Sequence, residues 1–513
     1  MSVGEYGLSV YAEKTPDKDF IVFGDRRITY GEGVRRVNRL ARGLQSLGLC
    51  PSDRVAILSR NCPEYIEVSQ AAAKIKAILV PVNYRLKKEE VEYVVADSES
   101  RALFVDMEQV ELVRGIQSSL KNIGTRSMIV IGGQAEGMVS YEDFMAGFSD
   151  EEPEVENPHV YGATMGYTSG TTGLPKGVYR KSPHTEMSVI VIRELGLRND
   201  DIHLVVGPFY HAAPIAMAGR EIMLGATIVI MKRMDPLEFL DTVEREKVST
   251  AFMAPIHLRY LFDLPQEELA KRDISSMRRI VVAGAPCPFK LKKQAVDYFG
   301  EGVLVEFYGS TDGGMNTVLR PEDQLKKPGS IGRPFPENEI IIVDENDKPL
   351  PPNQTGELLV YNPWLLDSYY KDPELTGKSF HGKYWRSGDV GYVDDEGYYY
   401  VVDRVKDMVI SGGVNIYPVE IENVILSHPG VFDCCVFGVP DKTYGEALKA
   451  VVQLRNGDEA TSEGMIQWVA ERLADYKKPK SVEFVESLPR DQSGKIMKRY
   501  LRDRYWAGQQ KKI

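Results

Sequence analysis

Apolar residues in the first 130 positions alternate between the spacing of helices and the short runs of buried strands. From Val34 to Leu47 they recur every three or four residues, and Gly48 stands where a left-handed helix cap belongs. Continuous apolar runs such as Val55–Leu58 are typical of buried strands. The same patterns predict further strands over Phe20–Phe23, Arg27–Tyr30, Ile78–Val82, Ala102–Val105 and Met128–Ile131, and helices over Glu64–Lys76, Glu89–Val95 and Met107–Ile123. This alternation predicts a mostly parallel sheet with helices on both faces.

An acidic, loop-rich stretch at residues 133–158 is followed by the apolar run Tyr161–Tyr167, and the alternation resumes from Ile202 to about Phe307. Further strands are predicted over Ile228–Met231, Thr250–Met253, Arg279–Ala283 and Leu304–Phe307, and helices over Leu237–Glu246 and Lys290–Phe299. From Gly329 to Val402 short strands are separated by turns, which predicts a small antiparallel unit, with a barrel as one arrangement.

The last hundred residues form a pattern of their own. Helices are predicted over Pro418–Leu426 and Ser462–Leu473, and strands over Val431–Val439, Ala447–Leu454 and Val482–Val485. The predicted fold class is therefore α/β, with a large N-terminal domain of α/β subdomains plus the small antiparallel β unit, and an α+β C-terminal domain. A chain of 513 residues is too long for one core, and its length favours roughly three folding units.

Composition narrows the class of protein. Hydrophobic residues make up 43% and charged residues 27%, as in soluble globular proteins. The net charge of −11 argues against a general nucleic-acid partner. Five cysteines, without a Cys-x-x-Cys pair, indicate thiols in a reducing compartment. Since the sequence also has no apolar signal core and no run of 18 apolar residues, we expect a cytoplasmic protein without a transmembrane segment.

The stretch from Tyr167 to Val178 carries the clearest chemical signal. It reads Tyr-Thr-Ser-Gly-Thr-Thr-Gly-Leu-Pro-Lys-Gly-Val, with five hydroxyl side chains, three glycines, one lysine and no acid. Glycine lets successive backbone N–H groups converge on one anion, and hydroxyls and Lys176 add donors and charge. A polyphosphate is the ligand this predicts, and a solvated turn is the alternative. The spacing differs from a Walker loop because Gly177 follows Lys176.

This string closely resembles the phosphate loop of the adenylate-forming superfamily, which includes acyl-CoA synthetases, amino-acid adenylation domains and luciferases. Further segments match the family's motifs in the family's order: Phe209–Pro214, Ala283–Pro286, Tyr308–Gly313, Trp385–Asp389, Asp403–Asp407, Ser411–Asn415 and Leu488–Ile496. Taken singly, each is also compatible with an ordinary turn or loop. Together they span most of the chain, which is therefore similar to an AMP-forming acyl-CoA synthetase.

The resemblance implies the residues that bind ATP. They are Thr168, Ser169, Gly170, Thr171, Thr172, Gly173, Lys176, Gly284, Ala285, Pro286, Tyr308, Gly309, Ser310, Thr311, Asp389, Arg404 and Lys495. Within this set, the segment around Gly284 contacts adenine, Tyr308 stacks on it, and Asp389 holds the ribose hydroxyls. The family usually has Glu where this chain has Asp312, which would bind Mg²⁺ with Thr168, while Thr171 or water completes the coordination.

The resemblance also implies catalytic and CoA-binding residues. Lys495, Thr168 and His211 are the expected catalytic residues, His211 facing the acyl group. Ser411, Gly412 and Gly413 are expected to line the path of the pantetheine of CoA. Lys406 matches the hinge of a mobile C-terminal domain, so we expect domains at residues 1–405 and 406–513.

The implied function is ATP- and Mg²⁺-dependent activation of a carboxylic acid, of fatty or similarly apolar type, followed by transfer to coenzyme A. Two alternatives stay open. A non-catalytic nucleotide or acyl-adenylate sensor is consistent with Asp312 and disfavoured by Lys495. An amino-acid adenylating enzyme is disfavoured because Phe209–Pro214 lacks the Asp that usually holds the α-amino group. A homodimer is compatible with the ligase function and with both alternatives.

Overall fold

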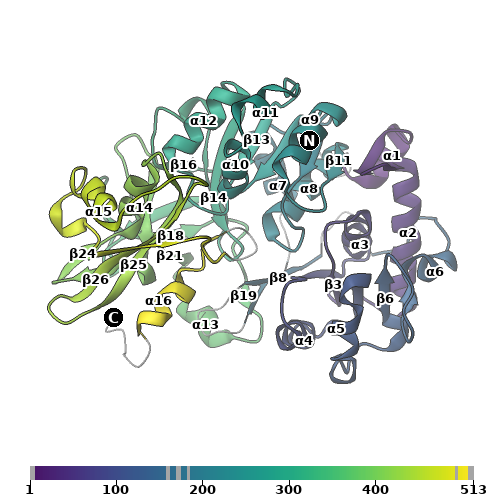
Figure 1. Ribbon diagram of the computed structural model, residues 1–513. Coiled ribbons are helices and arrows are strands. Elements are labelled where there is room, and N and C mark those ends of the chain that lie inside the picture. Colours follow the sequence, from purple (N-terminus) through teal and green to yellow (C-terminus); the bar gives the residue numbers. More distant parts are fainter. Residues whose placement is uncertain (1–5, 157–161, 169–174, 182–184, 491–494, 507–513) are drawn as a thin grey trace.

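The computed structural model describes residues 6–156, 162–168, 175–181, 185–490 and 495–506 (Figure 1). The N-terminal elements lie on the right of Figure 1, the middle of the chain at the top, and the C-terminal elements on the left. The central elements of the N-terminal domain thus separate the first sheet from the C-terminal domain.

A five-stranded parallel sheet forms one part of the N-terminal domain, in the order β4-β3-β5-β6-β7. Alternate residues of β3 point to opposite faces, so that Val55 and Ile57 join one apolar cluster and Ala56 and Leu58 another. The strands are β3 (Arg54–Leu58), β4 (Ile78–Val82), β5 (Ala102–Asp106), β6 (Met128–Ile131) and β7 (Val139–Ser140), and the helices of this region are α1 (Leu8–Lys14), α2 (Tyr30–Ser46), α3 (Pro63–Lys74), α4 (Lys88–Asp97), α5 (Val110–Arg114) and α6 (Tyr141–Ala146). The predicted sheet buried on both faces is confirmed.

The prediction of one helix over Met107–Ile123 is wrong. The segment contains a 3₁₀ turn at Met107–Gln109, the short helix α5, and a second 3₁₀ turn at Gln117–Ser119. Most of its apolar side chains, among them Val110, Val113 and Ile116, are nevertheless buried, which explains the misleading periodicity. Gly115 ends α5, and the Ser119 hydroxyl donates to the carbonyl of Ile116, so side-chain bonding competes with helix continuation.

The largest sheet has 14 strands, and its parallel part runs through β11, β10, β12, β13 and β14. The strands of this part and its edge are β1 (Asp19–Phe23), β2 (Arg26–Thr29), β10 (Ile202–Val205), β11 (Thr227–Ile230), β12 (Thr250–Met253), β13 (Arg279–Val282) and β14 (Leu304–Ser310). Its helices are α7 (Thr185–Leu195), α8 (Ala212–Leu224), α9 (Pro236–Glu246), α10 (Pro255–Phe262), α11 (Gln266–Ala270) and α12 (Phe289–Phe299). The carboxyl ends of the parallel strands meet at one edge, where open α/β sheets bind ligands.

The antiparallel unit predicted between Gly329 and Val402 continues this sheet and does not form a separate barrel. A hairpin of β14 with β15 reverses the strand direction, and β16 connects it to β22, β21, β18 and β17. The bounds are β15 (Gly314–Leu319), β16 (Ser330–Pro334), β17 (Glu339–Val343), β18 (Gly356–Tyr361), β20 (Phe380–His381), β21 (Tyr384–Val393) and β22 (Tyr399–Arg404), with α13 (Pro373–Lys378) between β18 and β20.

A small antiparallel sheet frames the predicted phosphate loop. It consists of β8 (Thr164–Thr168), β9 (Lys176–Arg180) and β19 (Ser368–Tyr369), in the order β19-β9-β8. Residues 169–174, which join β8 to β9, lie outside the described residues. The register pairs Thr168 with Lys176, so the two ends of the loop are neighbours across the hairpin.

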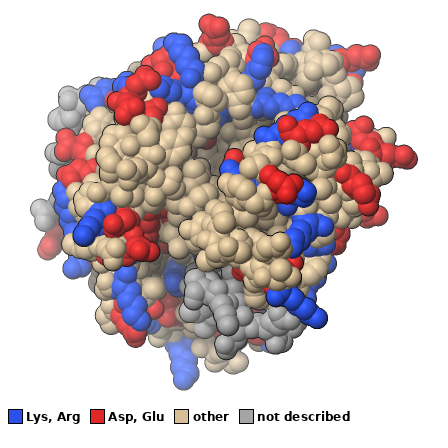
Figure 2. Space-filling view, turned by 90° about the vertical axis from the view of Figure 1, so that its left-hand side faces the viewer, with Lys and Arg blue, Asp and Glu red and all other residues tan. Residues whose placement is uncertain are grey.

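The C-terminal domain is α+β, as predicted. Its sheet has the order β24-β23-β26-β25, with β27 parallel to β26. The elements are β23 (Val409–Ser411), β24 (Val414–Ile416), α14 (Pro418–Leu426), β25 (Val431–Asp441), β26 (Gly445–Leu454), α15 (Ser462–Ala470), β27 (Ser481–Val485) and α16 (Lys498–Trp506). On the side of the molecule where these elements lie, basic and acidic side chains are interspersed (Figure 2). No helix within the described ranges is long and apolar enough to cross a membrane.

We predict that Gly225→Ala destabilises the N-terminal domain. Gly225 caps α8 with φ +84°, and an added Cβ would lie 2.3 Å from Cδ1 of Tyr11. An L side chain in this left-handed conformation costs about 1–2 kcal/mol, before any clash with Tyr11. Thermal unfolding followed by circular dichroism should show a lower Tm.

Gly219→Ala in the same helix is the matched control. Its Cβ would meet nothing within 4 Å, and Ala replaces Gly in a helix interior with a gain of about 0.5–1 kcal/mol. Its Tm should rise. If both variants shifted Tm in the same direction, the capping argument would be wrong.

Candidate functional site

A buried carboxylate, Asp389, is the point where three predicted nucleotide-binding residues meet. It lies within β21, is 4% exposed, and is paired in register with Arg404 at the end of β22. Arg404 Nε lies 2.5 Å from Asp389 Oδ1, and the Tyr308 hydroxyl donates to Asp389 Oδ2. Burial and the Asp389 charge raise the pKa of Tyr308, which therefore stays a hydrogen-bond donor. The motif containing Asp389 lies in a long strand, β21.

The predicted metal-binding pair is also brought together. Thr168 Oγ1 donates to Asp312 Oδ1 at 3.5 Å, and the Tyr369 hydroxyl donates to Oδ2 at 3.2 Å. The shorter side chain of Asp312 thus still reaches Thr168. Burial raises the pKa of Asp312, while the Tyr369 hydrogen bond opposes this. A nearby divalent cation would favour the charged carboxylate.

This donor set fits Mg²⁺. The described residues contain no group of three or more His, Cys, Asp or Glu side chains that could hold a metal on their own. Mg²⁺ commonly binds through one or two carboxylates plus substrate phosphates and water, rather than through an all-protein cage. Asp312 and Thr168 supply hard oxygen ligands of the kind such a shared site needs.

Arg180 and Tyr369 are site residues that the sequence motifs missed. Arg180 donates through Nε to the Trp364 carbonyl at 2.6 Å and through Nη2 to the Asp312 carbonyl at 3.1 Å. Burial lowers the pKa of Arg180 to about 10, so it remains a cation near neutral pH. The Tyr369 ring lies 5.5 Å from Lys176 Nζ, which links Lys176 to Asp312 through one side chain. For Arg180 a signal existed, because it follows Lys176 by four residues and shares its face of β9.

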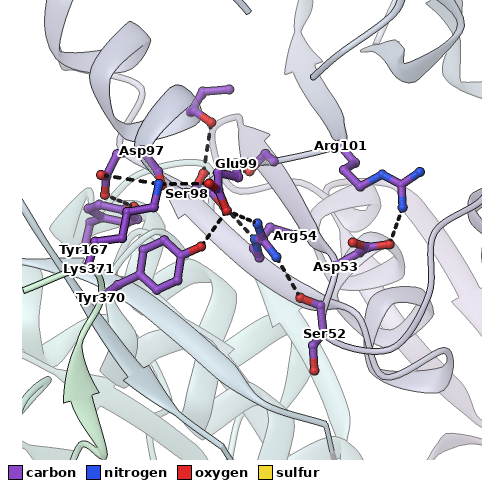
Figure 3. Close-up of polar contacts among 12 residues, drawn as sticks. Ser52, Asp53, Arg54, Asp97, Ser98, Glu99, Arg101, Tyr167, Tyr370 and Lys371 are labelled. Atoms are coloured by element: carbon purple, nitrogen blue, oxygen red, sulfur yellow. Dashed lines mark hydrogen bonds and ion pairs between the residues drawn. The ribbon is translucent and has the colours of Figure 1, made fainter. Parts of the chain in front are cut away.

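A polar network anchors the phosphate-loop hairpin to α4 (Figure 3). The Tyr167 hydroxyl donates to Asp97 at 2.6 Å, and the Tyr370 hydroxyl donates to Glu99 at 2.7 Å. Arg54 pairs with Glu99 at 2.7 Å from β3. Burial, assisted by Asp97, raises the pKa of Tyr167. Tyr167 therefore holds the hairpin in place and does not direct its hydroxyl to the phosphate loop.

The segment Ala283–Pro286 joins β13 to α12 at the carboxyl edge of the parallel strands. Gly284 has φ +93°, a conformation that L side chains rarely adopt. Ser310 and Thr311 follow at the end of β14, and Ser310 Oγ accepts from the Gly313 N–H at 2.8 Å. Gly309 lies at a bulge in the pairing with β15, where a Cβ would meet the Gly314 carbonyl at 2.2 Å. These motifs thus share one edge of the sheet.

Family models match this arrangement over most of the chain. The AMP-binding enzyme model matches residues 8–370, and the model of the AMP-binding enzyme C-terminal domain matches residues 420–495. The chain belongs to the AMP-binding enzyme family. The resemblance to adenylate-forming enzymes, the fold class and the ligase class are thereby confirmed.

Relatives of this AMP-binding enzyme differ in the acid named. The chain is 35% identical to a feruloyl-CoA synthase of Amycolatopsis sp, covering 96% of this chain and 97% of the relative. It is 34% identical to the long-chain-fatty-acid–CoA ligase FadD13 of Mycobacterium tuberculosis, covering 94% of each. It is 32% identical to a 2-succinylbenzoate–CoA ligase of Bacillus licheniformis, covering 96% and 98%.

Solved structures agree in fold. The anthranilate CoA ligase AuaEII in complex with anthranoyl-AMP has a TM-score of 0.88 at 27% identity, covering 99% of each chain. ATP-bound MatB from Rhodopseudomonas palustris has a TM-score of 0.85 at 26% identity, covering 97% of this chain and 99% of that one.

His211 of this AMP-binding enzyme is the N-cap residue of α8. Its ring centroid is 4.4 Å from that of Tyr210. Phe209 is buried, and its N–H donates to Asn61 Oδ1 at 2.8 Å, which fixes the segment before the helix. Burial, assisted by the nearby His211, lowers the pKa of His257 to about 4. A neutral imidazole, that of His257, thus lies near His211.

The predicted hinge and CoA residues lie at the start of the C-terminal domain. Lys406 is in a 3₁₀ turn at Val405–Asp407, and burial lowers its pKa. Ser411 ends β23, and Gly412 and Gly413, with φ +59° and +81°, form the turn to β24. Two successive positive φ angles are what a tight hairpin requires, so the turn explains the two glycines. Their role in CoA binding stays a prediction.

Lys495 is exposed and follows residues 491–494, which lie outside the described part of the chain. Just before them, Arg490 pairs with the buried Asp433, and Arg259 of α10 pairs with the same carboxylate. The Tyr260 ring stacks on Phe432 at 6.1 Å. Tyr260 and Phe432 both line a pocket of about 320 Å³. Their contact joins the N-terminal domain to the C-terminal sheet near the segment that carries Lys495.

We predict that His257 makes stability depend on pH. Its folded-state pKa of about 4 is below the ordinary 6.5, so the unfolded chain binds the proton more readily. The stability from a neutral His257 is present above pH 6.5 and is lost as pH falls toward 4, by about 3 kcal/mol in total. Wild-type Tm should fall between pH 7 and pH 5 more steeply than that of His257→Gln. Equal slopes would contradict the assignment.

Proposed function

We propose that this chain is an AMP-forming acid–CoA ligase that activates a fatty or similarly apolar carboxylic acid. The observation that carries the proposal is the convergence of Tyr308 and Arg404 on the buried Asp389, together with the Thr168–Asp312 pair. Asp389 can hold a ribose, because a carboxylate accepts hydrogen bonds from two vicinal hydroxyls. The Thr168–Asp312 pair can hold Mg²⁺ at the phosphates. Relatives named as CoA ligases for ferulic, long-chain fatty and 2-succinylbenzoic acids support the reaction class, and their variety leaves the acid to be determined.

In the first half-reaction, a carboxylate oxygen forms a bond to the α-phosphorus of ATP, and the bond to the bridging oxygen of pyrophosphate breaks. The reaction yields acyl-adenylate and pyrophosphate. Mg²⁺ held by Asp312 and Thr168 would offset phosphate charge. Lys176 and Lys495 would add positive charge, and Ser169–Gly173 would supply backbone donors. Positioning and charge neutralisation carry such a step, since little covalent help is needed.

In the second half-reaction, the CoA sulfur bonds to the acyl carbon, the bond from that carbon to the AMP oxygen breaks, and the thiol proton is released. We propose that residues 406–513 rotate about Lys406 between the two steps, so that Ser411–Gly413 replace Lys495 at the site. Such a rotation must break the Arg259–Asp433 pair and the Tyr260–Phe432 stack. A rigid-body exchange of this kind lets one site serve two reactions.

We predict that Lys495→Ala separates the two half-reactions. Adenylation, measured as pyrophosphate release from ATP with Mg²⁺ and a panel of carboxylates, should fall by about 10²–10³, since one charged donor is lost from the transition state. Thioester formation from supplied acyl-adenylate and CoA should change by only a few fold. An equal loss in both assays would contradict the proposed roles. A wild-type protein that never forms AMP would favour a nucleotide sensor.

We predict that Asp312→Ala weakens the response to Mg²⁺. Removing the only carboxylate of the Thr168–Asp312 pair should raise the Mg²⁺ concentration needed for half-maximal pyrophosphate release by about tenfold or more. Asp312→Glu is the matched control, because it keeps a carboxylate and should retain most of the affinity. Unchanged Mg²⁺ titrations in the alanine variant would exclude Asp312 as a ligand.

A further inference from the structure

Arg220 is a partly buried cation on α8 that the reaction described above does not use. Its Nη1 donates to the Ala216 carbonyl of the same helix at 3.1 Å, and its guanidinium lies 5.4 Å from the Trp364 ring centroid. Its Nε is shielded from solvent and bonds to none of the described residues. Burial lowers the pKa of Arg220 to about 10, so it is still charged near neutral pH.

Several fully or partly buried cations of this chain have a carboxylate partner, whereas Arg180 bonds to backbone carbonyls instead. Lys292 pairs with Glu306, Lys498 with Glu422 at 2.7 Å, and Arg278 with Asp201 at 2.5 Å. Within the described residues, no carboxylate lies within ion-pair distance of Arg220. Burying an unpaired charge is costly, and proteins normally offset the cost with a counter-ion. The neighbouring ring recovers part of it through a cation–π contact.

The surroundings of Arg220 are those of the acyl-activation site. Met217, one helical turn before Arg220, shares an apolar cluster with Trp364, Phe307 and Ala283. Phe307 and Ala283 immediately precede the Tyr308 and Gly284 motifs. The carbonyl of Trp364 is bound by Arg180, which also binds the carbonyl of Asp312. Arg220 therefore approaches, from α8, the same region that the metal and nucleotide motifs approach from the sheet.

The position along α8 sets a distance from the reacting end of the acid. The bond to Ala216 places the guanidinium near that residue's level, in line with the tendency of helical side chains to lean toward the N-terminus. Ala216 is five residues beyond His211, which corresponds to about 7.5 Å of helix rise. His211 is the residue we expect to face the reacting carboxylate.

We propose that Arg220 binds a second carboxylate at the far end of the acid, so that the preferred substrates are dicarboxylic acids with an apolar body. The proposal rests on the proposed function and names its substrate class. A guanidinium pairs with a carboxylate through two parallel hydrogen bonds, and the Nε of Arg220 has no partner among the described residues. A monocarboxylic acid of the same length would place a methyl group against the buried charge.

The test compares length-matched acids on the full-length protein with ATP, Mg²⁺ and CoA. Adipate, pimelate and suberate are paired with hexanoate, heptanoate and octanoate, and the readout is the ratio of kcat/KM within each pair. We expect at least one dicarboxylate to be favoured by about 100-fold, as expected where a buried polar group would otherwise be left unpaired. The proposal is overturned if the monocarboxylate is favoured, or equal, in every pair.

In the pair with the strongest wild-type preference, Arg220→Met should lower the ratio of kcat/KM by about 100-fold, because kcat/KM for the dicarboxylate falls. Arg220→Lys keeps the charge but cannot form the two parallel hydrogen bonds, so its ratio of kcat/KM should lie between those of the wild type and Arg220→Met. Arg193→Met is the control, because Arg193 is an exposed arginine of the neighbouring α7, and its ratio should equal that of the wild type. If Arg220→Met lowered both acids of a pair equally, Arg220 would be structural and the proposal would fail. If Arg220→Met did not fold, the wild-type ratios and Arg220→Lys would decide.

The two levels of the argument fail differently. If the wild type forms no AMP with any of the six acids or with longer fatty and aryl acids, the proposed function itself fails. If it activates acids without a preference for the second carboxylate, the function stands and only the role of Arg220 is refuted.

Discussion

The ion pair between Asp389 and Arg404 connects the parts of the molecule on which the reaction would depend. Asp389 is buried in β21, Arg404 ends β22, and Tyr308 reaches the same carboxylate from β14. One buried carboxylate thus joins three strands of the large sheet. Because Arg404 directly precedes the turn at Val405–Asp407, the same pair also determines where the chain leaves the N-terminal domain. A change in the nucleotide site would therefore act directly on the start of the C-terminal domain.

Burial is the main electrostatic feature of the site. It raises the pKa of Asp312, lowers that of Arg180 to about 10 and lowers that of His257 to about 4. Arg180 stays protonated near neutral pH because the ordinary pKa of an arginine is high enough that burial does not bring it down to 7. Asp312 would stay ionised near neutral pH beside a bound cation. An apolar, preorganised environment of this kind strengthens electrostatic interactions with a bound nucleotide.

Ion pairs and an aromatic stack join the two domains. Asp433 accepts from both Arg259 and Arg490, one from each domain, and Tyr260 stacks on Phe432 beside it. Removing one partner of such a buried pair leaves an uncompensated charge, so the contact favours a small number of defined arrangements over continuous motion. This property would suit the proposed rotation of residues 406–513 between two positions. It also places Arg490 at the beginning of the lysine-bearing segment.

Most elements and motif positions could be predicted from the sequence, because hydrophobic periodicity and turn chemistry are local. The helix at Pro418–Leu426 and the strand at Val55–Leu58 follow directly from them. The prediction of a helix over Met107–Ile123 was wrong because apolar spacing indicates only which residues are buried. A segment of 3₁₀ turns and one short helix can bury residues at the same spacing. A barrel, one of the arrangements left open for the antiparallel unit, does not form, and the sequence could not decide this because strand order is not a local property.

What the sequence determined by itself was the family, the α/β class and the residue types available for binding ATP. The tertiary structure alone decided that Tyr308, Asp389 and Arg404 share one carboxylate, that Tyr167 bonds to Asp97, and that Arg220 lacks a counter-ion among the described residues. The hydrogen bonds of Tyr167 and Tyr308 join residues 70 and 81 positions apart in the sequence. No local pattern encodes them, because they depend on sheet order and register, which arise only when distant segments pack together.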